Sequence, residues 1–162
     1  MKAIVNADKN WGIGNSNELL FHIPDDMKFF KQKTIGNVVV MGYATFLSLP
    51  GQKALPDRVN IVICNVEGWS APDVIVVRSL DELFAVLRRF DTNTVYVCGG
   101  ASIYEQLVPY CDTVYVTKVD SSKPADKFFP DLDKDPNWVL AKEGEEQEYK
   151  GVKYKFTTYK SI

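Results

Sequence analysis

The sequence has little of what metal centres, disulfide frameworks and membrane spans require. Its 162 residues include one histidine and three cysteines. Cys64, Cys98 and Cys111 have no metal-ligand spacing, and their odd number argues against a disulfide framework. Such thiols suit a reducing compartment. The apolar runs are too short for a signal peptide or a membrane span. We therefore expect a cytoplasmic protein that does not engage membranes.

The sequence also lacks an excess of charge of either sign. Lysine and arginine number 19, aspartate and glutamate 21, and the net charge is −2. Because both signs are spread along the chain, nothing favours a nucleic-acid partner or an anionic membrane. The hydrophobic content of 46% is typical of a globular protein. We predict a single domain over residues 1–162.

The apolar segments alternate between strand and helix patterns. Short β-branched runs predict strands at 3–7, 37–42, 58–64, 73–77, 94–98 and 113–119. Helical patterns begin at 24, 43, 80 and 101, the third with a capping box in which Ser79 and Glu82 bond each other's backbone. Segments 138–149 and 152–159 flank Lys150-Gly151 and predict a hairpin. These elements predict an α/β fold: a mainly parallel mixed sheet, helices on both faces and a C-terminal antiparallel hairpin.

One predicted helix carries an acid on an apolar face. Pro24 suits the first helical position, and helical periodicity then places Asp26 between Phe29 and Phe30. A carboxylate on an apolar face marks a cleft or a proton-handling site, because an unpaired buried charge is costly. The alternative is that Asp25 and Asp26 both cap the helix in solvent. The pattern alone leaves both interpretations open.

Other features suit ligand binding without proving it. Gly99-Gly100 and Gly42 each join a strand to a helix, where a phosphate can approach the backbone, although tight turns have the same pattern. The G-x-G-x-x-G motif is missing, so a Rossmann fold is not indicated. Arg58 is either a clamp for a carboxylate or a solvated charge. His22 has no catalytic partner at a suitable spacing, and we interpret it as structural.

In order and spacing, several segments together resemble the dihydrofolate reductase family, in its bacterial form. The matching segments are Trp11-Gly12-Ile13-Gly14, Ile23 to Phe30, Val40-Met41-Gly42 with Thr45, Leu55-Pro56-Asp57-Arg58, Gly99 to Tyr104, Thr117 to Asp120, and Phe129-Pro130. The resemblance implies an eight-stranded mixed sheet and hydride transfer from NADPH to 7,8-dihydrofolate in one-carbon metabolism. It also implies antifolates as inhibitors. We expect a monomer, since no extended apolar surface is evident.

The resemblance assigns substrate roles by position. Asp26 would be the catalytic acid that binds the pterin, hydrogen-bonded by Thr117, and Arg58 would hold the glutamate carboxylate. The side chains that would pack on the folate are Met27, Phe30, Leu49 and Leu55. The other substrate positions implied are Ile4, Val5, Cys98 and Tyr104.

It also assigns cofactor roles, and no metal site. The cofactor positions would be Asn6, Ile13, Gly14, Leu19, Gly42, Tyr43, Thr45, Cys64, Asn65, Arg78, Gly99, Gly100, Ala101, Ser102 and Ile103. Gly99 and Gly100 would be joined by the cis peptide bond typical of the family. Residues 11–20 would form a mobile loop that closes over the nicotinamide.

The chain departs from the family pattern at several positions. Phe21 replaces a common tryptophan, Tyr43 replaces a phosphate-binding arginine, and Asn6 replaces a small apolar residue. Cys64 and Asn65 replace hydroxyl residues near the 2′-phosphate, and Arg78 is a candidate for the missing positive charge. The alternatives are a pyrimidine reductase of riboflavin synthesis and a pterin- or nucleotide-binding module without catalytic activity.

Overall fold

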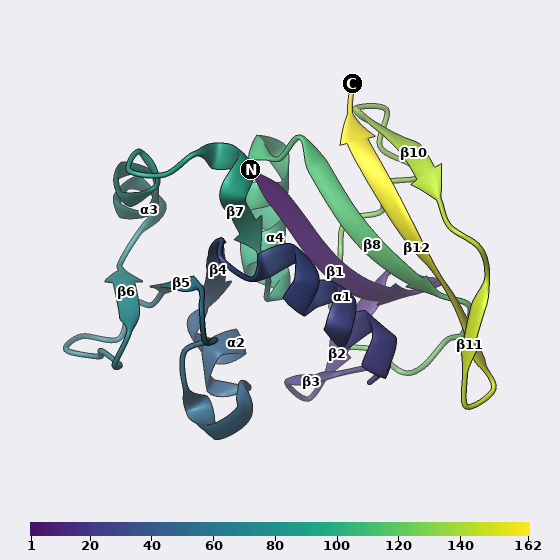
Figure 1. The fold of residues 1–162 in the computed structure, drawn as a ribbon, viewed down its shortest axis with the longest axis horizontal. Helices are drawn as coiled ribbons and strands as arrows, with labels where there is room; N and C mark the ends of the chain where they lie inside the picture. The colour runs from purple at the N-terminus through teal and green to yellow at the C-terminus, as the bar shows by residue number, and fades with distance from the viewer.

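A long mixed sheet forms the centre of the computed structural model, which describes residues 1–162 (Figure 1). Eight strands follow the order β10-β12-β8-β1-β7-β4-β5-β6, and β11 pairs with β12 as a ninth. The strands are β1 Lys2–Asp8, β4 Val38–Gly42, β5 Val59–Ile63, β6 Val74–Val77, β7 Val95–Val97, β8 Thr113–Val119, β10 Trp138–Glu143, β11 Gln147–Tyr149 and β12 Val152–Ser161. Pairs from β8 to β6 are parallel, whereas β12 pairs antiparallel with β8, β10 and β11. The predicted α/β class is confirmed.

Helices cover both faces of this sheet, because its central strands are apolar on both sides. In β4, Val38 and Val40 belong to the main core, whereas Val39 and Met41 pack on the other face with Phe46. Alternation of side chains along a strand produces this division. The helices are α1 Pro24–Thr34, α2 Tyr43–Leu47, α3 Leu80–Leu87 and α4 Ala101–Leu107, with short 3-10 turns η1 Pro50–Gln52, η2 Thr92–Thr94 and η3 Val108–Tyr110.

Helix α1 is fixed to the sheet by an aromatic contact. Phe29 packs against Tyr115 of β8 at 5.9 Å and Phe156 of β12 at 4.8 Å between ring centroids. Figure 1 shows α1 running close to β1 and β8. The N-terminal end of α1, which carries the two aspartates, is therefore held over the central strands.

The capping box of α3 is present with one change. Ser79 Oγ accepts from the backbone N–H of Glu82 at 3.2 Å, as predicted. The Glu82 carboxylate, however, accepts from the N–H of Arg78 at 2.6 Å, one residue before the expected partner. Both bonds still satisfy backbone donors at the start of the helix.

Two predicted segments differ in the structure. The segment 11–20, expected to be a loop, contains strands β2 Gly12–Asn15 and β3 Glu18–Leu19, and β2 pairs with both β3 and β9 Lys127–Phe128. Its pairing partner β9 lies more than 100 residues away, beyond the reach of a local pattern. The arm 138–149 is not one strand, because residues 144–146 between β10 and β11 are irregular, although Gly144 N still donates to Phe156 O of β12. No helix is long and apolar enough to cross a membrane.

Candidate active site

Asp26 lies in the first turn of α1 with both carboxylate oxygens hydrogen-bonded. Thr117 Oγ1 donates to Oδ1 at 2.6 Å, and Asn6 Nδ2 donates to Oδ2 at 2.9 Å. Asn6 of β1 and Thr117 of β8 are partners in the parallel register, so their side chains emerge on the same face of the sheet. Burial raises the pKa of Asp26 above its ordinary value, and the bonds from Thr117 and Asn6 oppose that rise.

The residues around Asp26 divide between solvent and core. Asp25 is exposed and does not cap the helix: the N-cap is Ile23, and it makes no side-chain capping hydrogen bond. Met27 is 58% exposed, and Phe30 is half-buried. An exposed apolar side chain next to a partly buried acid is typical of a binding cleft rather than of a plain helix surface.

The two predicted glycine junctions meet in space. Gly99 and Gly100 are joined by a cis peptide bond, and Gly42 N donates to Gly99 O at 2.8 Å. A Cβ atom added to Gly42 would lie 3.0 Å from Ile103, and one on Gly100 would lie 3.3 Å from Thr45. The glycines therefore allow two strand–helix junctions to approach closely, and the first turns of α2 and α4 leave N–H groups without intrahelical partners.

A cavity of about 290 Å³ brings together Tyr43, Cys64, Asn65, Arg78 and Ile103 from among the predicted cofactor positions. Its lining comprises Tyr43, Ile63, Cys64, Asn65, Arg78, Ser79, Leu80, Ile103 and Gln106. Arg78 is the one cation among these residues. Its guanidinium donates to the carbonyls of Cys64, Val66 and Trp69. Arg78 thus holds the segment after β5 as well as giving the cavity its positive charge.

Arg58 is held at the end of a loop before β5. Its Nε donates to Pro56 O at 2.9 Å, and Nη1 donates to Thr34 Oγ1 at 3.0 Å. Thr34 is buried and donates in turn to Phe30 O in α1. A guanidinium has five N–H donors, so Arg58 is fixed by two bonds and retains donors for a ligand carboxylate.

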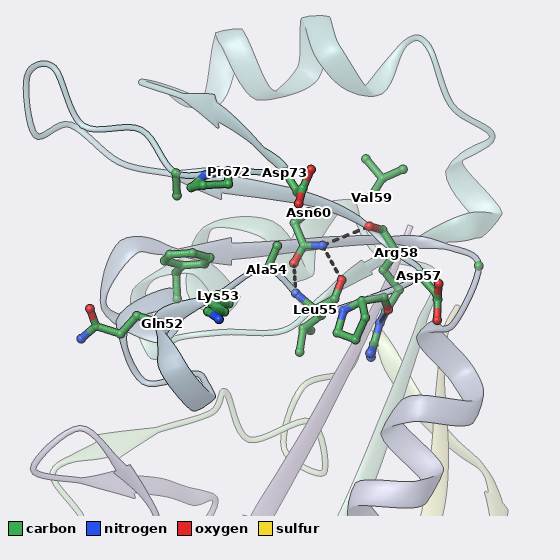
Figure 2. A pocket seen from close by; sticks show the side chains of 14 residues that line it. Gln52, Lys53, Ala54, Leu55, Asp57, Arg58, Val59, Asn60, Pro72 and Asp73 are labelled. Atoms are coloured by element: carbon green, nitrogen blue, oxygen red, sulfur yellow. Dashed lines mark hydrogen bonds between the residues drawn. The ribbon is translucent and has the colours of Figure 1, made fainter.

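Asn60 fixes the same loop, and our interpretation of the sequence missed it. It is 1% exposed, its Oδ1 accepts from Leu55 N, and its Nδ2 donates to Leu55 O and Arg58 O at 2.9–3.0 Å. Figure 2 shows these three bonds joining β5 to the loop. The available signal was a polar residue inside the apolar run 59–63, where a buried amide needs partners.

The cavity drawn in Figure 2 has a volume of about 680 Å³ and lies beside this loop. Leu55, Arg58 and Asn60 contribute to its lining, but Asp26, Asn6 and Thr117 do not. This cavity is therefore distinct from the site around Asp26.

The remaining substrate positions, Ile4, Val5, Cys98 and Tyr104, are buried or half-buried. Tyr104 OH donates to the carbonyl of Ile4 at 2.7 Å, so the hydroxyl supports β1; burial raises the pKa of Tyr104 well above its ordinary value. Burial also raises the pKa of the Cys98 thiol to about 12. Ile4 and Val5 are buried. Cys98 is therefore a neutral packing group.

The segment predicted to close over the nicotinamide is fixed to a distant part of the chain. Asp126 N donates to Gly14 O, and Ser16 N donates to Asp126 Oδ2, both at 3.0 Å. At its base, Asp8 is 2% exposed and accepts from the N–H groups of Asn10 and Gly12. Our interpretation of the sequence missed both residues: Asp8 bonds backbone groups two and four residues along the chain, whereas the Asp126 contact joins segments 110 residues apart.

The other departures from the family pattern are also located. Phe21 is 5% exposed and packs in a small apolar cluster, and its ring has no hydrogen-bond donor. His22 is exposed. The three cysteines are free, and no group of three or more potential ligands could hold a metal ion.

Comparison with known proteins gives one consistent result. A family model described as dihydrofolate reductase matches residues 1–161. The dihydrofolate reductase of Bacillus subtilis is 34% identical over 94% of this chain and 89% of its own length. That of Neisseria gonorrhoeae is 38% identical over 93% and 91%. A solved dihydrofolate reductase from Enterococcus faecalis, complexed with NADP(H) and RAB-propyl, aligns with a TM-score of 0.87 and 32% identity, over 99% of this chain and 95% of that one.

Proposed function

The chain belongs to the dihydrofolate reductase family, and on this basis we propose that it reduces 7,8-dihydrofolate to 5,6,7,8-tetrahydrofolate with NADPH. This reaction would supply one-carbon metabolism and nucleotide synthesis. The observation that carries the proposal is the partly buried Asp26 carboxylate, held between Thr117 and Asn6. The family assignment does not favour a pyrimidine reductase of riboflavin synthesis or a binding module without activity.

Asp26 is suited to bind the pterin ring. A carboxylate has about four lone-pair sites, and Thr117 and Asn6 occupy two of them. The two that remain match the ring N–H and the exocyclic amine of the pterin, which are adjacent donors. Arg58, fixed by Pro56 and Thr34, would bind the glutamate carboxylate at the other end of the substrate.

Apolar side chains would hold the middle of the substrate. Met27 and Phe30 belong to α1, and Leu49 and Leu55 lie in the segment that follows α2. All four keep some exposed surface, which a benzoyl ring would cover. Burial of that surface contributes affinity, while Asp26 and Arg58 fix the orientation.

The residues present fit NADPH, which when bound supplies the hydride. The close approach of Gly42 and Gly100 to Ile103 and Thr45 leaves no room for larger side chains, and the nearby first-turn N–H groups suit a pyrophosphate. Arg78 gives the 290 Å³ cavity a positive charge, which suits a 2′-phosphate. The other implied cofactor positions, Ile13, Gly14 and Leu19, lie in strands β2 and β3.

The chain's contribution to the chemistry is orientation and charge. Hydride addition to the imine carbon of the pterin leaves an electron pair on the neighbouring ring nitrogen, which then takes a proton. The anionic Asp26, bonded to the pterin's N–H groups, makes the ring more electron-rich and that nitrogen easier to protonate. Water would be the immediate proton donor. If the β2–β3 segment closes over the bound nicotinamide, as the family resemblance implies, it would limit access of bulk solvent.

We propose in addition that the protein acts as a monomer in the cytoplasm and that antifolates inhibit it. A folate analogue with two adjacent N–H donors would compete for the free lone pairs of Asp26. Sedimentation with and without such an analogue would test the oligomeric state, and competition against dihydrofolate would test the inhibition.

The test of the reaction is the fall in near-ultraviolet absorbance as NADPH is consumed. We expect the absorbance to fall only when protein, NADPH and dihydrofolate are all present. A binding module would bind both ligands but leave NADPH intact. Folded protein that binds both ligands without consuming NADPH would contradict the proposal, and repeating the assay with NADH would measure cofactor preference.

A further inference from the structure

The structure assigns Asn6 an unexpected role: we propose that it is a positioning residue that keeps the Asp26 carboxylate ionised and fixed in orientation. The resemblance placed Asn6 at the cofactor, but its amide bonds Asp26 instead, with 2.9 Å between Nδ2 and Oδ2. The inference rests on the proposed function, in which ionised Asp26 receives two N–H groups of the pterin.

The chemistry of the two groups fixes the direction of this hydrogen bond. An ionised carboxylate only accepts, so the amide must present its NH₂ side to Asp26. A hydrogen bond to an ionised acceptor is roughly twice as strong as a neutral one. The same contact to a protonated Asp26 would be weaker, and Asn6 therefore favours the charged form.

The position of Asn6 in the sheet makes this contact rigid. Asn6 is half-buried between the buried residues Val5 and Ala7 on β1, and the parallel register places it beside Thr117. One side chain therefore binds each carboxylate oxygen. A carboxylate bonded at both oxygens cannot rotate without breaking one of the bonds.

No cation is among the groups that shift the pKa of Asp26. The titratable groups around Asp26 are the acid Asp25 beside it on α1, and Tyr104 of α4 and Tyr154 of β12. The charge of Asp26 contributes to raising the pKa of both phenols, so they stay neutral near pH 7. Burial favours the neutral acid, and the two hydrogen bonds are the opposing interactions. Removing Asn6 deletes one of them.

Asn6 also determines what else Asp26 can bind. With Asn6, Thr117 and the two pterin donors in place, about four lone-pair sites are filled. A water molecule then has no site left on the carboxylate in the substrate complex. Asp26 would therefore act through its charge and its contacts with the ring, and the proton would reach the pterin by another path.

The test is a carboxyl titration of the ligand-free protein by NMR, with ¹³C-labelled aspartate. The Asp26 resonance is the one that disappears in Asp26→Asn. We expect Asn6→Ala to raise the titration midpoint of Asp26 by about one pH unit, the loss equivalent to one charge-assisted hydrogen bond. Asn6→Leu, which fills the space without a donor, should raise it as well, and it serves if the alanine variant does not fold.

Asn37→Ala is the matched control. Its amide donates to Lys33 O at 2.9 Å near the far end of α1, so the variant removes an asparagine–helix bond that does not involve Asp26. We expect its midpoint to equal that of the wild type. An unchanged or lowered midpoint in folded Asn6→Ala and Asn6→Leu would overturn the proposal.

Catalysis provides a separate readout. As the pH is lowered and Asp26 becomes protonated, the KM for dihydrofolate should rise. If Asn6 keeps Asp26 ionised, this rise should begin at a higher pH in Asn6→Ala than in the wild type. The KM for NADPH should not follow this change; an equal rise in both would contradict the role. The ligand-free titration does not depend on turnover, so an inactive wild type would refute the proposed function and leave the titration result valid.

Discussion

Replacement of Asn60 by alanine tests whether hydrogen bonds from β5 hold the loop between Leu55 and Arg58 in place. Asn60 is buried and makes three hydrogen bonds, two with the backbone of Leu55 and one with that of Arg58 (Figure 2). These bonds keep the segment between Leu55 and Arg58 folded against β5. Without them, Arg58 would lose the backbone anchor that complements its contact with Thr34.

The structure sets the size of the effect. Each of the three bonds contributes about 1 kcal/mol to stability, so Asn60→Ala should lower the free energy of unfolding by about 3 kcal/mol. If the loop instead opens in the variant, water hydrogen-bonds the backbone groups that Asn60 held. The loss then appears as a weaker free energy of dihydrofolate binding. A loss of about 1.5–3 kcal/mol there corresponds to a ten- to hundredfold drop in kcat/KM.

The assay compares two substrates and one control variant. Asn60→Ala should lose kcat/KM toward dihydrofolate but remain almost unchanged toward a dihydropterin that lacks the benzoylglutamate tail, because in the proposed binding mode only the tail would contact Arg58. Urea unfolding measures the stability. Gln52→Ala is the control, since Gln52 is exposed and lines the same cavity. Equal losses with both substrates, or none with either and an unchanged unfolding midpoint, would refute the reasoning.

Three other changes give distinct results. Asp26→Asn should retain NADPH binding, measured by fluorescence, but lose most dihydrofolate turnover at neutral pH; equal turnover would remove Asp26 from its role. Arg78→Ala should weaken NADPH binding about ten- to hundredfold, as expected for a lost charged contact, and NADH binding much less, which calorimetry would measure. Partial burial raises the pKa of Asp133, but bonds from Lys118 and Tyr159 lower it more, so its folded pKa is depressed. Its stabilisation is therefore present above about pH 4 and lost as the pH falls: urea unfolding of Asp133→Asn should show a deficit at neutral pH that disappears in acid.

The parts of the fold that depend on local pattern followed from the sequence. The apolar runs at 37–42 and 58–64 are strands β4 and β5, and Ser79 caps α3. Parallel strands buried on both faces need continuous apolar sequence, and this signal is strong. Strand β2 was missed because its neighbours in the sheet are β3, which has only 2 residues, and β9, which is remote in the sequence.

The candidate site was only partly predictable for a similar reason. The order of the motifs identified Asp26 and Thr117, which the structure joins at 2.6 Å. The contact of Asn6 with Asp26 depends on the register of β1 and β8. The hydrogen bonds of Asn60 depend on how a loop folds back on β5. Side-chain hydrogen bonds across the fold leave little trace in local periodicity.

The most direct test of the central claim follows the hydride itself. NADPH deuterated at the transferring position would be incubated with the protein and dihydrofolate, and the product would be analysed by mass spectrometry. We predict tetrahydrofolate that carries a single deuterium at the former imine carbon. Folded protein that forms no tetrahydrofolate, or that forms it without deuterium, would contradict the account.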